Sequence, residues 1–132
     1  MRQLVLLLFM SIGTAYAQEN DSLSFYYNTY QFQTLINKVE PIENKTAREL
    51  FIMGKAYKQL GQFSDAEQAF IHAVKIDSVN PIYLSQLADF LIKLKKGHLA
   101  FMHYQKLIQL QPNNAYYYKK LGQAISLSLI HI

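Results

Sequence analysis

The sequence predicts an all-α fold in which short helical hairpins stack in series as a solenoid. Three observations lead to this prediction. Apolar residues recur at spacings of three and four, which places them on one side of an α-helix. The pattern of large and small residues repeats every 34 residues from about residue 47 onward. Proline, asparagine and glycine interrupt the pattern where one helix would end and the next begin.

The first residues have the features of a secretory signal peptide. Arg2 supplies a positive charge, residues 4–12 form an apolar run, and a small-x-small cleavage site ends at Ala17. We therefore expect residues 1–17 to be removed and the product to be exported, to a periplasmic or extracellular location, with no transmembrane span left after cleavage. The alternative is an uncleaved membrane anchor, but the apolar run is far shorter than the roughly 20 residues that span a bilayer.

Composition narrows the classes of function. The chain has no cysteine, so an exported product has no disulfide bonds and its stability comes from packing alone. If Arg2 leaves with the signal, 12 of the 13 lysine and arginine residues remain against 9 acidic residues, a net charge of about +3. The excess is small and most of the basic residues are scattered, so we do not predict nucleic-acid binding.

Residues 18–45 precede the repeats and are expected to form an N-terminal helical cap. Large apolar residues between residues 24 and 39 have helical spacing, with an interruption around residues 28–31. We interpret the segment as a short helical hairpin that covers the first repeat, because the end of a stacked array needs a cap. Pro41 ends this hairpin.

A 34-residue period organises residues 46–126. In each unit a small residue on one helix faces a small residue on the other, so that the two backbones approach closely while large apolar neighbours fill the space around them. The matched positions are Leu50, Leu84 and Tyr118; Met53, Leu87 and Leu121; Gly54, Ala88 and Gly122; Tyr57, Leu91 and Ile125; Ala66 and Ala100; and Phe70 and Tyr104.

These residues resemble the tetratricopeptide-repeat pattern, W-x2-L-G-x2-Y followed by A-x3-F and then P. The tryptophan is missing here, and Ser78 stands where the second unit has Pro112. The resemblance implies two complete repeats, residues 47–80 and 81–114, and a partial third from residue 115. It also implies a right-handed superhelix in which the first helix of each repeat lines a concave groove.

Local signals mark the ends of the helices. Thr46 and Glu49 have the spacing of a capping box, in which each residue satisfies a backbone amide of the other. Asn80 is followed by proline, a combination that supplies an N-cap and a first-turn residue without an amide hydrogen. Gly61 lies beside the turn inside the first hairpin, and Lys95 stands at the matched position of the second.

The last residues are interpreted as foreign to the repeat array. The third unit begins its first helix near residue 115, and no partner helix follows to bury the apolar face of that helix. Residues 127–132 resemble a translated sequencing adaptor, so we expect a non-native tail and a longer natural gene. The alternative is a true C-terminus in which Leu127, Leu129 and Ile130 end an apolar helix.

No motif for catalysis, a cofactor or a metal ion stands out. The sequence lacks a glycine-rich phosphate loop, a nucleophile elbow and a His-Glu-x-x-His motif. His98 and His103 are five residues apart, which puts them on different faces of a helix, and no cysteine is available to complete a metal site. We therefore predict that the protein is not an enzyme and that it holds no cofactor or metal.

The resemblance implies that an extended or helical peptide docks in the groove. Basic, amide and apolar groups there favour a partner with acidic and apolar residues. We predict an adaptor or scaffold that mediates protein–protein interaction; the alternative is the N-terminal regulatory or docking arm of a larger enzyme or signalling protein. The candidate groove residues are Arg48, Phe51, Lys55, Lys58, Ser85, Gln86, Asp89, Lys119, Lys120 and Gln123.

Some members of this family bind the terminal carboxylate of a peptide with a lysine and two asparagines. The corresponding positions here hold Phe51, Lys55 and Gln86, so we do not expect this carboxylate clamp. A competing interpretation of the candidate residues is that they are solvated groups on a scaffold whose contacts lie elsewhere.

Overall fold

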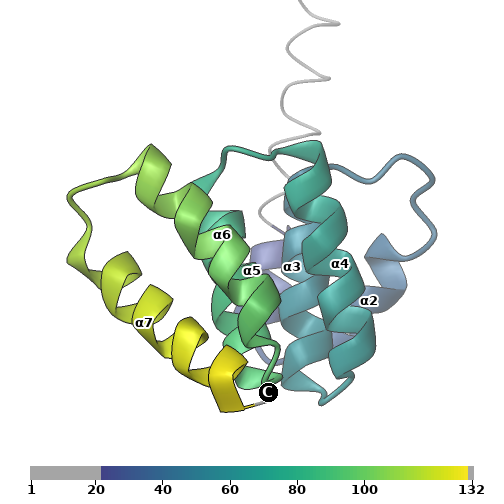
Figure 1. Cartoon of the computed structure of the whole chain (residues 1–132). Helices are drawn as coiled ribbons and strands as arrows, with labels where there is room; N and C mark the ends of the chain where they lie inside the picture. Colours follow the sequence, from purple (N-terminus) through teal and green to yellow (C-terminus); the bar gives the residue numbers. More distant parts are fainter. Residues whose placement is uncertain (1–21, 131–132) are drawn as a thin grey trace, which may run out of the picture.

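Helices account for most of residues 22–130, the part of the chain that the computed structural model describes (Figure 1). No strand occurs among these residues, which confirms the all-α prediction. The predicted signal peptide, residues 1–17, lies outside the described residues. A helical segment over residues 22–28 is followed by α2 (Phe32–Val39), α3 (Ala47–Gln59), α4 (Phe63–Ile76), α5 (Pro81–Lys93), α6 (Gly97–Leu110) and α7 (Ala115–Ile130).

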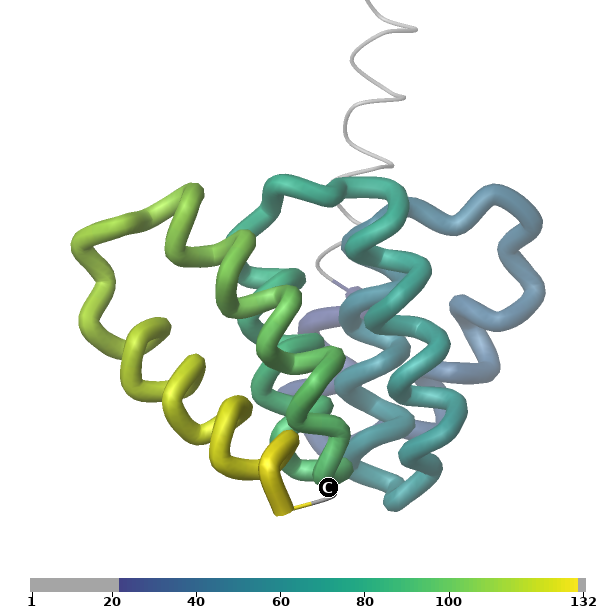
Figure 2. Tube along the Cα trace, in the orientation of Figure 1, coloured from purple at the N-terminus to yellow at the C-terminus, as the bar shows by residue number. Residues whose placement is uncertain are grey.

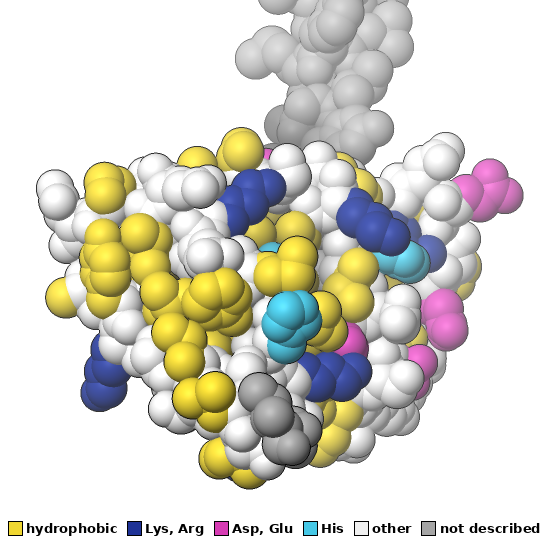
Figure 3. Space-filling model, viewed as in Figure 1, with side chains coloured by type: hydrophobic (Ala, Val, Ile, Leu, Met, Phe, Trp, Pro, Cys, Tyr) yellow, Lys and Arg dark blue, Asp and Glu magenta, His cyan; other side chains and the backbone are white. Residues whose placement is uncertain are grey.

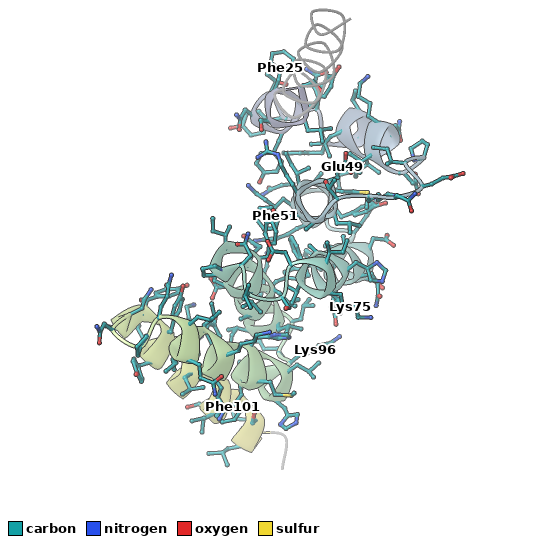
Figure 4. The ribbon with its side chains drawn as sticks, turned by 90° about the horizontal axis from the view of Figure 1, so that it is seen from above. Phe25, Glu49, Phe51, Lys75, Lys96 and Phe101 are labelled. Carbon is teal, nitrogen blue, oxygen red and sulfur yellow. The ribbon has the colours of Figure 1, made fainter. Side chains whose placement is uncertain are left out.

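The helices form a stack in which neighbours along the chain are neighbours in space (Figure 2). The most extensive contacts join α3 to α4, α5 to α6 and α6 to α7, and smaller ones join α2 to α3 and α4 to α5. Seen from above, the array extends from the N-terminal helices, near Phe25, to the C-terminal ones, near Phe101 (Figure 4). This arrangement is the helical solenoid that the 34-residue period predicts.

Side-chain caps begin α3 and α5 as the sequence predicts. The backbone amide of Glu49 donates to the Thr46 hydroxyl at 3.2 Å, and the amide of Thr46 donates to the Glu49 carboxylate at 2.7 Å. The Asn80 side chain accepts from the amides of Ile82 and Tyr83, at 3.0 and 3.4 Å. Each cap satisfies amides that have no partner inside the helix.

The two hairpin turns share one backbone conformation although their residues differ. Gly61 has a φ of +75°, and Lys95, at the matched position, has a φ of +63°. Both turns close with the same bonds: the amides of Gln62 and Lys96 donate to carbonyls five residues back, at 2.9 and 2.8 Å. The fold therefore places a lysine in the left-handed region, where a side chain is unfavourable.

Small residues allow the paired helices to approach closely. A Cβ atom added at Gly54 would lie 2.8 Å from carbons of the Phe70 ring, which is buried between α3 and α4. Gly97 begins α6 rather than ending α5, and a Cβ there would lie 2.6 Å from the carbonyl oxygen of Ala124. Both glycines therefore have a packing role, and Gly97 serves the α6–α7 contact in addition to the turn beside it.

The third unit corrects part of the repeat prediction. We expected Tyr118 and Gly122 to hold packing positions, but Tyr118 is 50% exposed and a Cβ at Gly122 would meet nothing within 4 Å. Their counterparts Leu84 and Ala88 are fully buried, because α6 covers them. No helix in the described part of the chain covers the same face of α7, so these positions stay open.

Residues 127–130 belong to α7, which continues to Ile130. Leu127 packs against the core, and its Cβ is one of the nearest atoms to the space beside Gly97. The interpretation of residues 127–132 as a non-native tail stays a prediction, and its last two residues lie outside the described part of the chain.

Alanine at Gly54 and at Gly122 is expected to change stability in opposite directions. Gly54→Ala should lower the free energy of unfolding by about 1–3 kcal/mol, because the Phe70 ring must shift. Gly122→Ala should raise it by about 0.5–1 kcal/mol, since alanine favours the helix and the space is open. Urea unfolding of dilute protein measures both. Equal effects at the two sites would contradict the packing role of Gly54.

Exchange of the two turn residues tests the strain at Lys95. Lys95→Gly is expected to raise the free energy of unfolding by about 0.5–1 kcal/mol, because glycine adopts a positive φ without steric cost. The matched change, Gly61→Lys, should lower it by a similar amount. Thermal unfolding followed by circular dichroism compares the two variants with the natural chain. A Lys95→Gly variant less stable than the natural chain would count against this account of the turn.

Candidate functional site

The candidate site lies on the side of α3 and α5 where lysine side chains gather. Lys55 and Lys58 come from α3, and Lys93 comes from the last turn of α5. The charge of Lys93 lowers the pKa of Lys58, and so does that of Lys55, which shows that the three ammonium groups share one region. We call Lys55, Lys58 and Lys93 the lysine cluster.

Each amine of the lysine cluster makes a cation–π contact with an aromatic ring. The Lys55 Nζ atom lies 4.2 Å from the centroid of the Tyr27 ring and 5.7 Å from that of Phe51. Lys58 lies 5.9 Å from the ring of Phe90, and Lys93 lies 5.2 Å from the ring of Phe63. The negative faces of these rings attract the ammonium groups, and the rings exclude part of the water around them.

Burial and mutual repulsion destabilise the charged form of two of these lysines. Desolvation lowers the pKa of Lys55. Desolvation also lowers the pKa of Lys58; Lys93 and Lys55 lower it further, while Asp89 raises it in part. Within residues 22–130, the ion pair found joins Lys96 Nζ to Glu67 Oε2 at 2.7 Å. No lysine of the cluster therefore has an ion-pair partner among these residues. An anion placed near the lysine cluster would stabilise the charged lysines and so offset both their desolvation and their mutual repulsion.

Asp89 is an acidic group whose charge acts on Lys58, and two tyrosines bind its carboxylate. The hydroxyls of Tyr104 on α6 and Tyr116 on α7 both donate to its carboxylate, the latter at 2.8 Å. Burial and the Asp89 contact raise the pKa of Tyr104 and raise the pKa of Tyr116 to about 12. Asp89, assigned to the groove from sequence, therefore links α5, α6 and α7 in addition to facing the site.

Phe51 is shared between the site and the core. Its ring lies 4.8 Å from that of Tyr83 on α5 and 6.0 Å from that of Phe70 on α4, measured between centroids. The side chain is half-buried. Phe51 therefore links the first repeat to the second. The part of its ring that remains exposed provides apolar surface beside Lys55.

The remaining candidates are spread along the array. Arg48 donates to the Ser24 hydroxyl at 3.0 Å, which ties it to the N-terminal helix. Ser85 donates to the Ile82 carbonyl, and Gln86 is half-buried. On α7, Lys119 and Gln123 are exposed, and Lys120 lies 5.5 Å from the Tyr116 ring. The structure thus brings Lys55 and Lys58 together with Lys93 and leaves the α7 residues as a separate group.

Sequence reasoning missed Tyr27 as a site residue. Its ring contacts Lys55, and its hydroxyl accepts from the Gln59 amide at 3.4 Å, so the N-terminal helix forms one border of the site. The pair Tyr26-Tyr27 was visible as an aromatic signal, but nothing in the local sequence shows which ring turns toward α3. Phe63 and Phe90 are further ring partners that only the packing of α4 and α5 reveals.

Two of the hollows outside the lysine cluster lie beside α4. One, of about 530 Å³, is bordered by the loop before α3 and by α4, with Leu50, Met53 and His72 among its lining residues. The other, of about 270 Å³, lies against α4, α5 and α6 and includes Ile71 and His103. The described residues contain no group of three or more potential metal ligands. Within residues 22–130, no helix combines the length and hydropathy needed to cross a membrane.

Comparison with known proteins agrees with this architecture. A profile of the family described as tetratricopeptide repeat matches residues 48–80. No curated protein matches the sequence. The fold is similar to that of the MamA protein, with a TM-score of 0.72 and 17% identity over 87% of this chain and 67% of that chain.

Two other solved structures with a similar fold include a bound peptide or protein region. The first TPR of Spaghetti (RPAP3) bound to the HSP90 peptide SRMEEVD has a TM-score of 0.69 and 19% identity, over 84% of this chain and 92% of that chain. PcrH in complex with the chaperone-binding region of PopB has a TM-score of 0.64 and 14% identity, again over 84% and 92%. At these identities the likeness shows the fold.

Removing either side of the Asp89 contact should reveal how strongly it couples α5 to α6. Asp89→Ala leaves the buried Tyr104 hydroxyl without its acceptor, which should cost about 1–3 kcal/mol of unfolding free energy. Tyr104→Phe should cost less, because Asp89 keeps Tyr116. The double variant should be less destabilised than the sum of the two single variants. Urea unfolding provides the three values, and strict additivity would argue against a direct bond.

Proposed function

We propose that this tetratricopeptide-repeat protein is a non-enzymatic adaptor that binds a segment of another protein at the lysine cluster. Members of this fold bind peptides or protein segments, as the complexes of Spaghetti (RPAP3) and PcrH illustrate. The observation that carries the proposal is the lysine cluster itself. Three amines lie over aromatic rings, without an ion-pair partner among the described residues and with the adjacent carboxylate held by two tyrosines.

The proposed partner segment carries acidic and apolar side chains. Carboxylates would pair with the ammonium groups, whose charge is destabilised by desolvation at Lys55 and Lys58. Apolar side chains would contact the exposed edges of the aromatic rings; Phe63, for example, is 40% exposed. Charge attraction would speed encounter with the partner, and ring contact would slow its release.

The acids of the partner are proposed to be side chains rather than a terminal carboxylate. A clamp for a chain terminus uses one lysine and two asparagines on successive first helices, and Phe51, Lys55 and Gln86 replace them here. Phe51 is packed against Tyr83 and Phe70 and cannot donate a hydrogen bond. A row of acidic side chains suits the spread of Lys55, Lys58 and Lys93 better than one carboxylate does.

The place of action is proposed to be outside the cytoplasm. The support is the N-terminal sequence pattern of residues 1–17 together with the absence of cysteine, which removes any dependence on the redox state of the compartment. An adaptor in that location would hold components of an envelope or secreted assembly together through its groove.

Charge reversal at the lysine cluster should weaken binding of the partner segment. Purified protein is incubated with an array of peptides that vary in acidic and apolar content, and bound peptides are then titrated. Lys55→Glu combined with Lys58→Glu is expected to weaken binding by about tenfold or more, because two attractive contacts become repulsive. Binding by the natural chain should also weaken as salt is added.

The matched control is Lys75→Glu, an exposed lysine on α4 beside the hollow lined by His72. It changes the net charge in the same direction without touching the lysine cluster, so it should leave binding nearly unchanged. Equal loss from the control, or full binding by the double variant, would rule out the lysine cluster as the binding site.

A further inference from the structure

The repeat places opposite charges at one matched position of the site. Lys55 on α3 and Asp89 on α5 are 34 residues apart, one full period of the array. Matched positions of successive repeats lie next to each other along a stack of this kind. The charges of both residues act on Lys58, so the two groups lie in the same region. A segment that crosses from α3 to α5 therefore meets first a positive and then a negative group.

The positive and the negative group of α5 contact different neighbours. Asp89 and Lys93 are four residues apart, the spacing at which opposite charges commonly pair along a helix. No ion pair joins them within residues 22–130. The Lys93 amine lies 5.2 Å from the centroid of the Phe63 ring on α4, whereas the Asp89 carboxylate accepts hydrogen bonds from Tyr104 on α6 and Tyr116 on α7. The site is therefore positive toward α4 and negative toward α6 and α7.

Opposite charges do pair between the second helices of the hairpins. Lys96 Nζ lies 2.7 Å from Glu67 Oε2, which joins the start of α6 to α4. Figure 3 shows basic and acidic side chains next to one another on the face that α4 and α6 form. The separation of charge on α5 is thus a local feature of the site, because a spacing suitable for pairing is available there.

Asp89 can accept a further hydrogen bond from a partner. Its side chain is partly exposed, and each carboxylate oxygen receives one tyrosine hydroxyl. A carboxylate has about four acceptor positions, so each oxygen retains capacity for another donor. Burial and the Asp89 contact raise the pKa of Tyr116 to about 12, so its hydroxyl stays protonated and donates at neutral pH. Lys120 on α7 lies 5.5 Å from the centroid of the Tyr116 ring and forms no ion pair with Asp89 within residues 22–130. Asp89 therefore presents a negative charge to the site.

We propose that Asp89 determines the specificity of the site by selecting a partner segment of mixed charge. Acidic side chains of the segment pair with Lys55 and Lys58, and one basic side chain pairs with Asp89. The inference rests on the proposed binding at the lysine cluster and adds a rule about which acidic segments are accepted. A uniformly acidic segment would bring a carboxylate against Asp89, and such a repulsive contact discriminates between similar partners.

The packing of the first helices sets the distance between the acidic and the basic side chain of the partner. α3 and α5 make contact through the rings of Phe51 and Tyr83, whose centroids are 4.8 Å apart. The axes of packed helices are about 8–10 Å apart, and an extended chain advances about 3.3 Å per residue. We therefore expect the basic side chain about three residues from the nearest acidic one. Both directions of the segment satisfy this spacing, so the rule concerns charge and distance alone.

Two synthetic peptides test this rule, each acetylated and amidated so that only side chains carry charge. Both begin with alternating glutamate and leucine followed by a pair of alanines, and the next residue is lysine in one peptide and glutamate in the other. Their affinities for the protein, purified from an export-competent host, are measured by calorimetry at physiological salt. The lysine peptide should bind about fivefold more tightly. The net charge of the protein, +4 at pH 7, favours the all-glutamate peptide, so this preference has to come from a specific contact.

Two variants separate the charge of Asp89 from its structural role. Asp89→Asn removes the charge, and the amide oxygen still accepts from the tyrosine hydroxyls, so the preference should reverse in favour of the all-glutamate peptide. Tyr116→Phe is the matched control, because it removes one of the hydroxyls bound to Asp89 and keeps the charge. It should retain the preference for the lysine peptide. Circular dichroism and urea unfolding establish that both variants are folded.

The outcomes distinguish this inference from the proposed function on which it rests. Equal binding of the two peptides by the natural protein, or tighter binding of the all-glutamate peptide, would overturn the role of Asp89 and leave the lysine cluster as the binding site. An Asp89→Asn variant that still prefers the lysine peptide would overturn it in the same way. If neither peptide binds, or if Lys55→Glu combined with Lys58→Glu binds both as the natural protein does, the lysine cluster is not the site and both proposals are overturned.

Discussion

The close approach of paired helices at small residues is the constraint on which the structure depends. A helix of 13 or 14 residues, such as α3 or α4, is marginal alone in water, so its stability comes from the partner against which it packs. At Gly54 the Phe70 ring occupies the space that a side chain would take, and at Gly97 the backbone of α7 does so. Larger residues at these positions would separate the helices and forfeit the dispersion contacts around them. Ala88 repeats the small residue of Gly54 34 residues later and is fully buried, so the second hairpin packs in the same way as the first.

The same constraint explains why equal positions in the repeat have unequal environments. Leu84 is fully buried and Tyr118, one period later, is half-exposed, although both are large apolar residues at the same register. Burial at this register requires a second helix that packs on the first helix of the repeat. Of the three first helices α3, α5 and α7, only α3 and α5 have such a partner within residues 22–130. Gly122 shows the same effect, because its lack of a side chain has a purpose only when another backbone comes near. Within residues 22–130, this face of α7 therefore leaves apolar surface exposed.

The packing constraint also determines which residues form the lysine cluster, the proposed binding surface. Positions of α3 and α5 that are not used in helix pairing point away from the hairpin, and there Lys55, Lys58 and Lys93 meet the rings of Tyr27, Phe90 and Phe63. Asp89 offsets part of this positive charge, and its carboxylate accepts hydrogen bonds from two tyrosine hydroxyls of the next helices. The tyrosines thus stabilise the joint between the repeats, and no ion pair within residues 22–130 occupies the three lysines. The joint between the repeats and the proposed binding surface therefore share Asp89.

The sequence by itself determined the helical class, the period and the caps at Thr46 and Asn80, because these follow from local spacing and residue size. It also matched Lys95 to the turn position of Gly61, and the structure showed that both residues have a positive φ. It also indicated Lys55 and Lys58 as groove residues. Tertiary structure alone decided that Tyr27 borders the site, that Phe51 is shared with the core, and that Tyr118 and Gly122 stay open. The physical reason is that periodicity specifies which face of a helix a residue occupies, whereas burial and charge pairing depend on which other element covers that face.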